Sequence, residues 1–157
     1  MIIAGSPRGG SAKYLNEICE ATSHYVDRGR IIQRIEYIPD QEIELYFKAA
    51  DVFVLPYTFI FQSGVLFLGY SFGLPVIATD VGSLREDIVE GETGFLCRPC
   101  DPAGLARTIE TYFESDLFKS LSSRRQKIRD YAGKRHSWDA VAEMSRRVYA
   151  ELGNDLL

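Results

Sequence analysis

Short apolar runs alternate along this chain with segments whose apolar residues recur at helical spacing. Strands are predicted at the runs 1–4, 31–38, 52–55 and 74–78, most of which are too apolar to leave one face in water. The segments between these runs carry apolar stripes with the helical period of about 3.6 residues. This alternation predicts an α/β fold in which helices cover both faces of a parallel sheet.

Several residues mark where the predicted helices begin. Ser11 is a candidate N-cap, Asp40 can cap the next helix, and Asp101 with Pro102 fits the N-cap and first position of another. The segment 63–72 is apolar nearly all round, which predicts a helix buried on most sides. Further helices are predicted near 117–131 and in a terminal segment at 135–157. We expect a single domain over residues 1–157.

Composition and charge narrow the class of protein. The 157 residues are 46% hydrophobic and 25% charged, a globular mixture. The net charge of −4 argues against non-specific nucleic-acid binding, which requires a basic surface. No apolar run approaches the ~20 residues of a membrane span. Three cysteines do not form a disulfide framework, so we expect a reduced, soluble, cytoplasmic protein.

Three turns follow predicted strands at the edge of the sheet where ligands bind in open parallel sheets. They are the segments 5–11, 37–40 and 56–65. The third is the most informative, because Ser63 and Gly64 open a helix whose unpaired N–H groups can receive a diphosphate. The alternative is that Ser63 only caps the helix and Gly64 only permits close packing.

The first turn supports a different function. Gly-Ser-Pro-Arg at 5–8 resembles the phosphate-binding turn of flavodoxin-like NAD(P)H-dependent flavin reductases. It is not a Walker A loop, because Ser11 stands after Gly10 where that motif requires Lys. A flavin reductase is therefore kept as an alternative function.

Other candidate chemistry has a simpler interpretation. Cys97 and Cys100 have Cys-x-x-Cys spacing, but no second ligand pair accompanies them, so we expect loop cysteines and no metal site. His24 and His136 fit no catalytic constellation and are expected at the surface or at a helix cap. The basic residues of the C-terminal third are expected on a solvated helix face, with an anionic membrane surface as the alternative. They are Arg124, Arg125, Lys127, Arg129, Lys134 and Arg135.

Three longer motifs carry a family resemblance. The segments 50–56 (ADVFVLP), 73–83 (GLPVIATDVGS) and 90–96 (EGETGFL) resemble glycosyltransferase family 4. More specifically, they are similar to the C-terminal, nucleotide-sugar-binding half of a GT-B enzyme. The resemblance extends from the first strand to the terminal helix that bears Trp138. It implies a Rossmann-like sheet that is half of a GT-B fold.

The resemblance implies a retaining transferase of polysaccharide or glycolipid biosynthesis. Such an enzyme moves a sugar from a nucleoside diphosphate to an acceptor by front-face displacement, without a metal ion or other cofactor. By position, Ser63, Gly64 and Val65 would hold the phosphates through backbone N–H groups. The other implied contacts are Tyr37, Ile38 and Pro39 beside the base, and Tyr57 and Gln62 on the sugar side.

Two departures from the family pattern affect the expected activity. Ile60 and Leu68 stand where the family usually has two glutamates, and neither accepts a hydrogen bond. The first strand–helix unit of the domain is also lacking, which would leave two strands without an inner neighbour. We expect the gap to be closed by collapse of the flanking strands, by a second copy or by a partner segment, and we expect an N-terminal acceptor domain to complete the enzyme. Alone, the chain is expected to bind donor weakly and transfer no sugar; a fragment that serves only assembly remains the third interpretation.

Overall fold

The computed structural model describes residues 1–7, 9–135 and 137–154. The strands are β1 (Ile2–Ala4), β2 (Ile32–Arg34), β3 (Phe53–Leu55), β4 (Val76–Thr79) and β5 (Gly94–Cys97). The helices are α1 (Ala12–Asp27), α2 (Asp40–Ala49), α3 (Gly64–Ser71), α4 (Leu84–Asp87), α5 (Pro102–Glu114), α6 (Asp116–Lys119), α7 (Leu121–Arg135) and α8 (Trp138–Asn154). They form two compact units, Met1–Ala49 (unit 1) and Ala50–Leu157 (unit 2).

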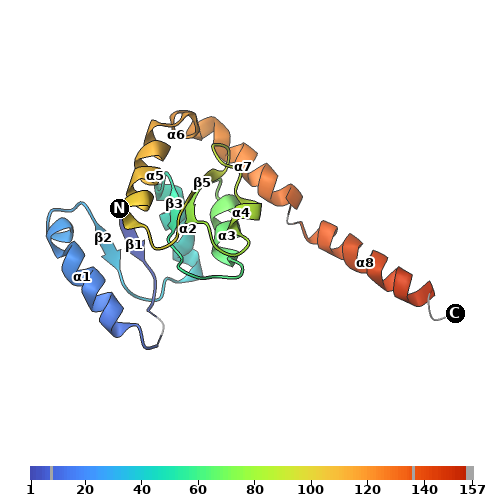
Figure 1. Ribbon diagram of the computed structural model, residues 1–157, viewed down its shortest axis with the longest axis horizontal. Helices are drawn as coiled ribbons and strands as arrows, with labels where there is room; N and C mark the ends of the chain where they lie inside the picture. Colours follow the sequence, from blue (N-terminus) through green and yellow to red (C-terminus); the bar gives the residue numbers. More distant parts are fainter. Residues whose placement is uncertain (8, 136, 155–157) are drawn as a thin grey trace. The chain divides into compact units, whose positions relative to one another are not determined.

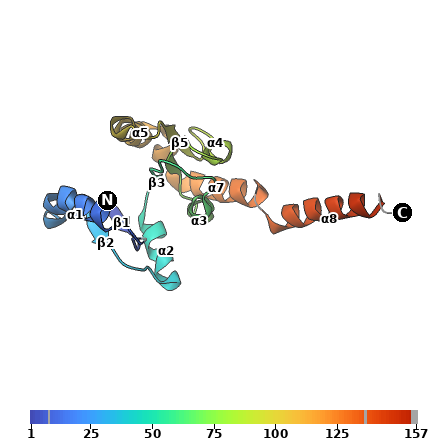
Figure 2. The same cartoon turned by 60° about the horizontal axis from the view of Figure 1, so that its bottom comes forward.

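Unit 1 contains a parallel two-stranded sheet and two helices. β1 pairs with β2 from Ile2↔Ile32 to Ala4↔Arg34, and α1 connects the two strands. In both views α1 lies beside this pair (Figure 1, Figure 2), and the Gln33 Nε2 of β2 donates a hydrogen bond to the Thr22 hydroxyl of α1. α1 begins after Ser11, as predicted.

The second strand is shorter than the predicted run 31–38. β1 ends at Gly5, where φ is +140°, and the Gly5 N–H donates to the Arg34 carbonyl (3.0 Å) as the last ladder bond. The Arg34 side chain forms an ion pair with Glu36, with 2.6 Å between Nε and Oε1. Because its partner strand stops, β2 has nothing to pair with beyond Arg34, and residues 35–39 form a loop.

Unit 2 is built on a parallel sheet of three strands in the order β3-β4-β5. β4 is the central strand, and all four of its residues are buried. Its register pairs Val76 with Phe53 on one side and with Gly94 on the other. A central strand without a polar face is what a parallel sheet covered on both sides requires.

Helices cover both faces of this three-stranded sheet, as predicted (Figure 1). Successive residues of β4 point to opposite faces. Val76 and Ala78 join a cluster with residues of α3, α4 and α7, namely Leu66, Tyr70, Leu84 and Ile128. Ile77 joins a second cluster with Tyr112 of α5 and Leu117 of α6. The two faces therefore have separate cores.

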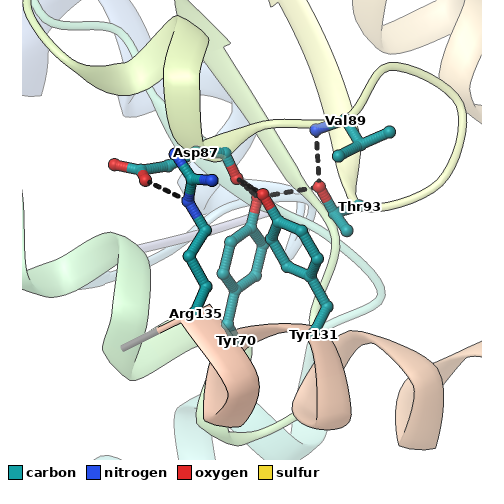
Figure 3. A network of polar contacts seen from close by, with 6 residues as sticks. All are labelled: Tyr70, Asp87, Val89, Thr93, Tyr131 and Arg135. Carbon is teal, nitrogen blue, oxygen red and sulfur yellow. Dashed lines mark hydrogen bonds and ion pairs between the residues drawn. The ribbon is translucent and has the colours of Figure 1, made fainter. Parts of the chain in front are cut away.

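A polar network holds three helices and a turn together in unit 2 (Figure 3). The Tyr70 and Tyr131 hydroxyls both donate to the Asp87 carbonyl at 3.2 Å. The Tyr70 and Thr93 hydroxyls also share a hydrogen bond of 3.0 Å. The buried Asp87 carboxylate accepts from Arg135 Nε at 3.1 Å. These bonds fix α3, α4 and α7 around the turn that precedes β5.

Several element boundaries differ from the sequence-based ones. The predicted helix 117–131 is two helices, because Ser120 ends α6 and α7 begins at Leu121. The terminal helix, predicted over 135–157, is α8 at Trp138–Asn154, and residues 136 and 155–157 lie outside the described residues. β5 and α4 were not predicted. Asp101 caps α5 as expected, since its Oδ1 accepts from the Gly104 N–H (2.7 Å).

Candidate functional site

The β3–α3 loop (residues 56–63) leads from the carboxyl end of β3 to the N-terminus of α3. Ser63 is the N-cap, with extended backbone (φ −123°, ψ 106°), and its side chain makes no capping hydrogen bond. The Ser63 carbonyl accepts from the Leu66 N–H at 3.2 Å. In a helix the first N–H groups have no intrahelical acceptor, so those of Gly64 and Val65 remain available to a ligand.

The space in front of this helix end is open. Gly64 is exposed, and a Cβ added to it would meet no atom within 4 Å. Val65 is 42% exposed. The alternative that Gly64 serves close packing is therefore wrong, and Ser63 is an N-cap by position without a side-chain bond. The side-chain position of Gly64 is therefore open to solvent.

Buried polar contacts position the loop. The hydroxyls of Tyr57 and Ser63 share a hydrogen bond of 3.4 Å, and Ser63 is only 3% exposed. The buried Thr79 hydroxyl at the end of β4 donates to the Tyr57 carbonyl at 2.5 Å. Gln62, in contrast, is exposed. Tyr57 thus braces the loop, while Gln62 is free to contact a ligand.

A second turn, after β4, packs against the middle of this loop. The Ser83 N–H donates to the Phe61 carbonyl at 3.0 Å. Gly82 has φ +56°, and an added Cβ would lie 2.1 Å from the Ile60 carbonyl oxygen. Only glycine fits there. Beside this turn the Asp80 carboxylate binds Arg85 at two points, one of them Nε–Oδ1 at 2.9 Å, and raises the pKa of Arg85.

The residues expected near a base lie in unit 1. Tyr37, Ile38 and Pro39 form the end of the loop between β2 and α2, at the carboxyl end of β2. Tyr37 is 71% exposed, and Ile38 and Pro39 are half-buried. The other predicted contacts belong to unit 2.

Ile60 and Leu68 provide packing instead of hydrogen-bond acceptors. Ile60 is half-buried and contacts the core cluster around Leu55 and Ala78. Leu68 is half-buried on α3. The two side chains that flank Ile60 in the loop, Phe59 and Phe61, are 88% and 85% exposed. Their exposure was not predicted, because apolar residues next to a buried strand are normally expected in the core.

The cysteines and histidines considered as candidates from the sequence lie outside the β3–α3 loop. Cys97 is buried, its thiol lies 3.5 Å from the Ala78 carbonyl, and burial raises its pKa, whereas Cys100 is exposed. His24 is exposed at the end of α1, and His136 lies outside the described residues, as does Arg8 of the first turn. Among the residues that the structure describes, no three His, Cys, Asp or Glu side chains gather as a metal site.

The basic residues of α7 are partly structural. Arg125 donates to the Ala50 carbonyl (2.8 Å), and Arg135 pairs with the buried Asp87. Arg124 and Arg129 donate to the side chains of Ser120 and Gln126. These basic residues therefore do not form only a solvated face, because some of them also hold α7 to other parts of unit 2. In the described part of the chain, no helix is long and apolar enough to cross a membrane.

Comparison with known proteins shows the family of this chain. The sequence profile described as glycosyl transferases group 1 matches residues 1–115. The chain belongs to this family. D-inositol 3-phosphate glycosyltransferase of Corynebacterium efficiens is 30% identical over 152 residues, which cover 96% of this chain and 34% of that protein. Glycogen synthase of Mycobacterium tuberculosis is 26% identical over 132 residues, covering 84% and 31%.

Solved structures agree on the fold of this group 1 glycosyltransferase chain. Sucrose-phosphate synthase from Thermosynechococcus elongatus superposes with a TM-score of 0.76 at 23% identity, covering 98% of this chain and 38% of that one. Anabaena HepE, solved in complex with UDP, gives 0.76 at 21% identity, covering 98% and 40%. These matches support a Rossmann-like, GT-B domain. The family match includes the turn at 5–11, so it favours a glycosyltransferase over a flavin reductase.

The chain spans about a third of the length of the curated relatives it matches, 34% in the first case above. Those relatives therefore extend beyond the region that matches this chain.

Proposed function

We propose that this chain is the donor-binding part of a glycosyltransferase and binds a nucleoside diphosphate sugar at the N-terminus of α3. The observation that carries the proposal is the open helix end, where the N–H groups of Gly64 and Val65 have no intrahelical acceptor. The helix dipole adds a partial positive charge at the same place. Structures of Anabaena HepE with UDP and with UDP-glucose show that a protein of similar fold binds such ligands.

The proposed contacts fall into three groups, each of which lies within a single unit. The diphosphate is held by backbone N–H groups at Ser63, Gly64 and Val65. The base lies beside Tyr37, Ile38 and Pro39, and the sugar lies beside Tyr57 and Gln62. The first part rests on the geometry described above, and the other two rest on position in the family pattern.

In the proposed reaction the bond between the sugar's anomeric carbon and the diphosphate oxygen breaks. An acceptor hydroxyl forms the new bond on the same face, and its proton passes to the departing diphosphate, so the configuration is retained. The chain's contribution is to stabilise negative charge that grows on the diphosphate as it leaves. The acceptor site would lie on a further domain, a partner segment or a second copy.

The test measures thermal stabilisation by nucleoside diphosphates. We expect UDP, ADP or GDP to raise the melting temperature of the purified chain, since a ligand that binds only the folded state stabilises it. Gly64→Ala should place a methyl group in the open space and weaken binding by about tenfold or more. Absence of a shift with all three diphosphates would contradict the proposal.

Gly133→Ala is the matched control. Gly133 lies on α7, is exposed, and would also accept a Cβ without any contact within 4 Å. Both substitutions should leave the fold intact, but only Gly64→Ala should reduce the diphosphate shift. A separate assay with UDP-glucose and simple sugar acceptors should detect no transfer by the isolated chain; transfer would show that no acceptor domain is needed.

A further inference from the structure

A pocket of unit 2 lies at the opposite edge of its sheet from the β3–α3 loop. It is shallow, has a volume of about 450 Å³, and is formed by the end of β5 and by α5, which lies beside β5 (Figure 2). β4 separates β3 from β5, and this β5–α5 pocket shares no lining residue with the N-terminus of α3. Pockets that hold small molecules typically have about 300–1,000 Å³, so its volume suits such a ligand.

The helix α5 presents a polar stripe to this pocket. Residues at positions i, i+3, i+4 and i+7 share one face of a helix, and the four residues of α5 that line the pocket have this spacing. They are Gly104, Arg107, Thr108 and Thr111. The apolar stripe of the same helix, with Leu105, Ile109 and Tyr112, packs on the core. The core therefore does not need the polar stripe, and substitutions in this stripe can test binding.

Two guanidinium groups make the lining of the pocket net positive. Arg98, at the end of β5, is exposed and has no hydrogen-bond or ion-pair partner among the residues that the structure describes. Arg107 forms a long ion pair with Asp101, with 3.6 Å between Nη2 and Oδ2. The other Asp101 oxygen accepts the Gly104 N–H at 2.7 Å, which holds this carboxylate at the N-cap of α5. Both arginines can therefore donate to an anion.

Neutral hydrogen-bond acceptors line the same pocket. Leu96 faces away from β4, since its N–H donates to Glu90 Oε1 at 2.7 Å. The Leu96 carbonyl has no partner in the described part of the chain. The hydroxyls of Thr108 and Thr111 donate to helix carbonyls at 2.9 Å, so each keeps lone pairs that can accept. Because Glu90 occupies the Leu96 N–H, this edge has no free donor at Leu96 for a further strand.

We propose that the β5–α5 pocket binds the phosphate ester of a small hydroxylated molecule. Arg98 and Arg107 hold the phosphoryl group, because the planar fork of a guanidinium matches the oxygens of a phosphate. The hydroxyl groups of the ligand donate to the Leu96 carbonyl and to the two threonine hydroxyls. This site is additional to the proposed donor site and does not depend on it.

The test follows the backbone amide signals of the 15N-labelled chain by NMR during titration with inorganic phosphate and with glycerol 3-phosphate. Constant ionic strength keeps the screening of charges equal. We expect saturable shifts at Arg98, Gly104 and Thr108, with tighter binding of glycerol 3-phosphate, because it alone supplies alcohol hydroxyls. Arg98→Gln/Arg107→Gln should weaken both affinities by about tenfold or more, since charge-assisted hydrogen bonds are lost.

Arg146→Gln/Arg147→Gln is the matched control. The side chains of these two arginines on α8 are 79% and 72% exposed, against 69% for Arg107, and the substitutions change the net charge by the same amount. This variant should keep both wild-type affinities. Equal weakening in the two double variants would overturn the proposal, because the binding would then reflect overall charge.

The remaining outcomes separate this site from the donor site. Gly64→Ala should leave the shifts at Arg98, Gly104 and Thr108 unchanged. Shifts confined to Gly64 and Val65, or shifts that do not saturate, would overturn the β5–α5 site and leave the proposed function standing. Equal affinity of wild type for the two probes would overturn the hydroxylated part of the ligand class.

Discussion

Two glycines shape the candidate site through their backbones. Gly64 leaves open space at the N-terminus of α3, and Gly82 lets the turn after β4 approach the β3–α3 loop. The first is available to a ligand, and the second fixes the loop that would contact it. Site geometry here depends on residues that have no side chain, so substitution of Gly64 tests ligand binding and substitution of Gly82 tests how the loop is held.

Gly82→Ala should be more destabilising than Gly91→Ala. Both glycines have positive φ, +56° and +75°, so each substitution costs about 1–2 kcal/mol of backbone strain. Gly91 has open space around it, whereas a Cβ on Gly82 would collide with the Ile60 and Phe61 carbonyls. Thermal melting should show the larger loss for Gly82→Ala, with weaker sugar-nucleotide binding in that variant alone. Equal losses of stability in the two variants would mean that the β3–α3 loop shifts to accommodate the added methyl group.

The two cysteines of the Cys-x-x-Cys segment should react at different rates. Burial raises the pKa of the Cys97 thiol, which reduces its thiolate fraction at any pH below that value, and it also blocks access. Cys100 is exposed. Iodoacetamide should therefore label Cys100 well before Cys97 in the native chain, and mass spectrometry of peptides can follow both. Equal rates would show that β5 opens readily.

At the scale of elements, hydrophobic pattern was sufficient for the order of strands and helices but not for their ends. The run 31–38 looks like one strand, yet β2 stops at Arg34 because its neighbour β1 stops at Gly5. β5 and α4 are too short and too mixed in polarity to show a period. The lengths of these elements are set by pairing partners that are distant in sequence, so a local hydrophobic pattern cannot predict them.

The candidate site was predicted in part. The helix start at Ser63–Gly64 followed from turn chemistry, since glycine and serine at a strand-to-helix junction are a recognisable signal. The support from Gly82 and Ser83 is a contact between two loops about twenty residues apart in sequence. The exposure of Phe59 and Phe61 is set by how the loop packs in the folded chain, which the local hydrophobic pattern does not contain.

The network around Asp87 should make unit 2 sensitive to alkaline pH. Burial raises the pKa of Tyr70, so its stabilising contribution is complete below the ordinary tyrosine pKa of about 10 and is lost as pH rises above it. Tyr70→Phe should cost about 1 kcal/mol near neutral pH, because Tyr131 and Val89 still donate to the two acceptors.

Urea unfolding of wild type and Tyr70→Phe, near neutral pH and above about pH 10, checks this expectation. The variant should lose less stability than wild type over that interval, because one titrating group is gone. Tyr131→Phe is the comparison, since its hydroxyl donates to the same Asp87 carbonyl from a half-buried ring. An identical pH response in wild type and Tyr70→Phe would show that ionisation of this hydroxyl does not limit stability.

At the scale of the whole molecule, the two units differ in how much they bury. Both core clusters belong to unit 2. In unit 1 neither α1 nor α2 contains a buried residue, and Ile31 is the buried hydrophobic residue of its described part. Ile2, Ile32 and Leu45 are 39–66% exposed and line a shallow pocket of about 270 Å³. Little apolar burial therefore opposes the unfolding of unit 1.

Hydrogen exchange should show this difference as separate stabilities. α2 and α5 are a suitable pair, because both are amphipathic, but only α5 packs on a core, through Tyr112. Amides of α2 should exchange rapidly by local opening, at a rate nearly independent of low urea. Those of α5 should exchange slowly, with a strong urea dependence, because they require unfolding of unit 2. If both helices were equally protected and equally urea-dependent, the two units would unfold as one, and the weak core of unit 1 would have to be compensated by other contacts.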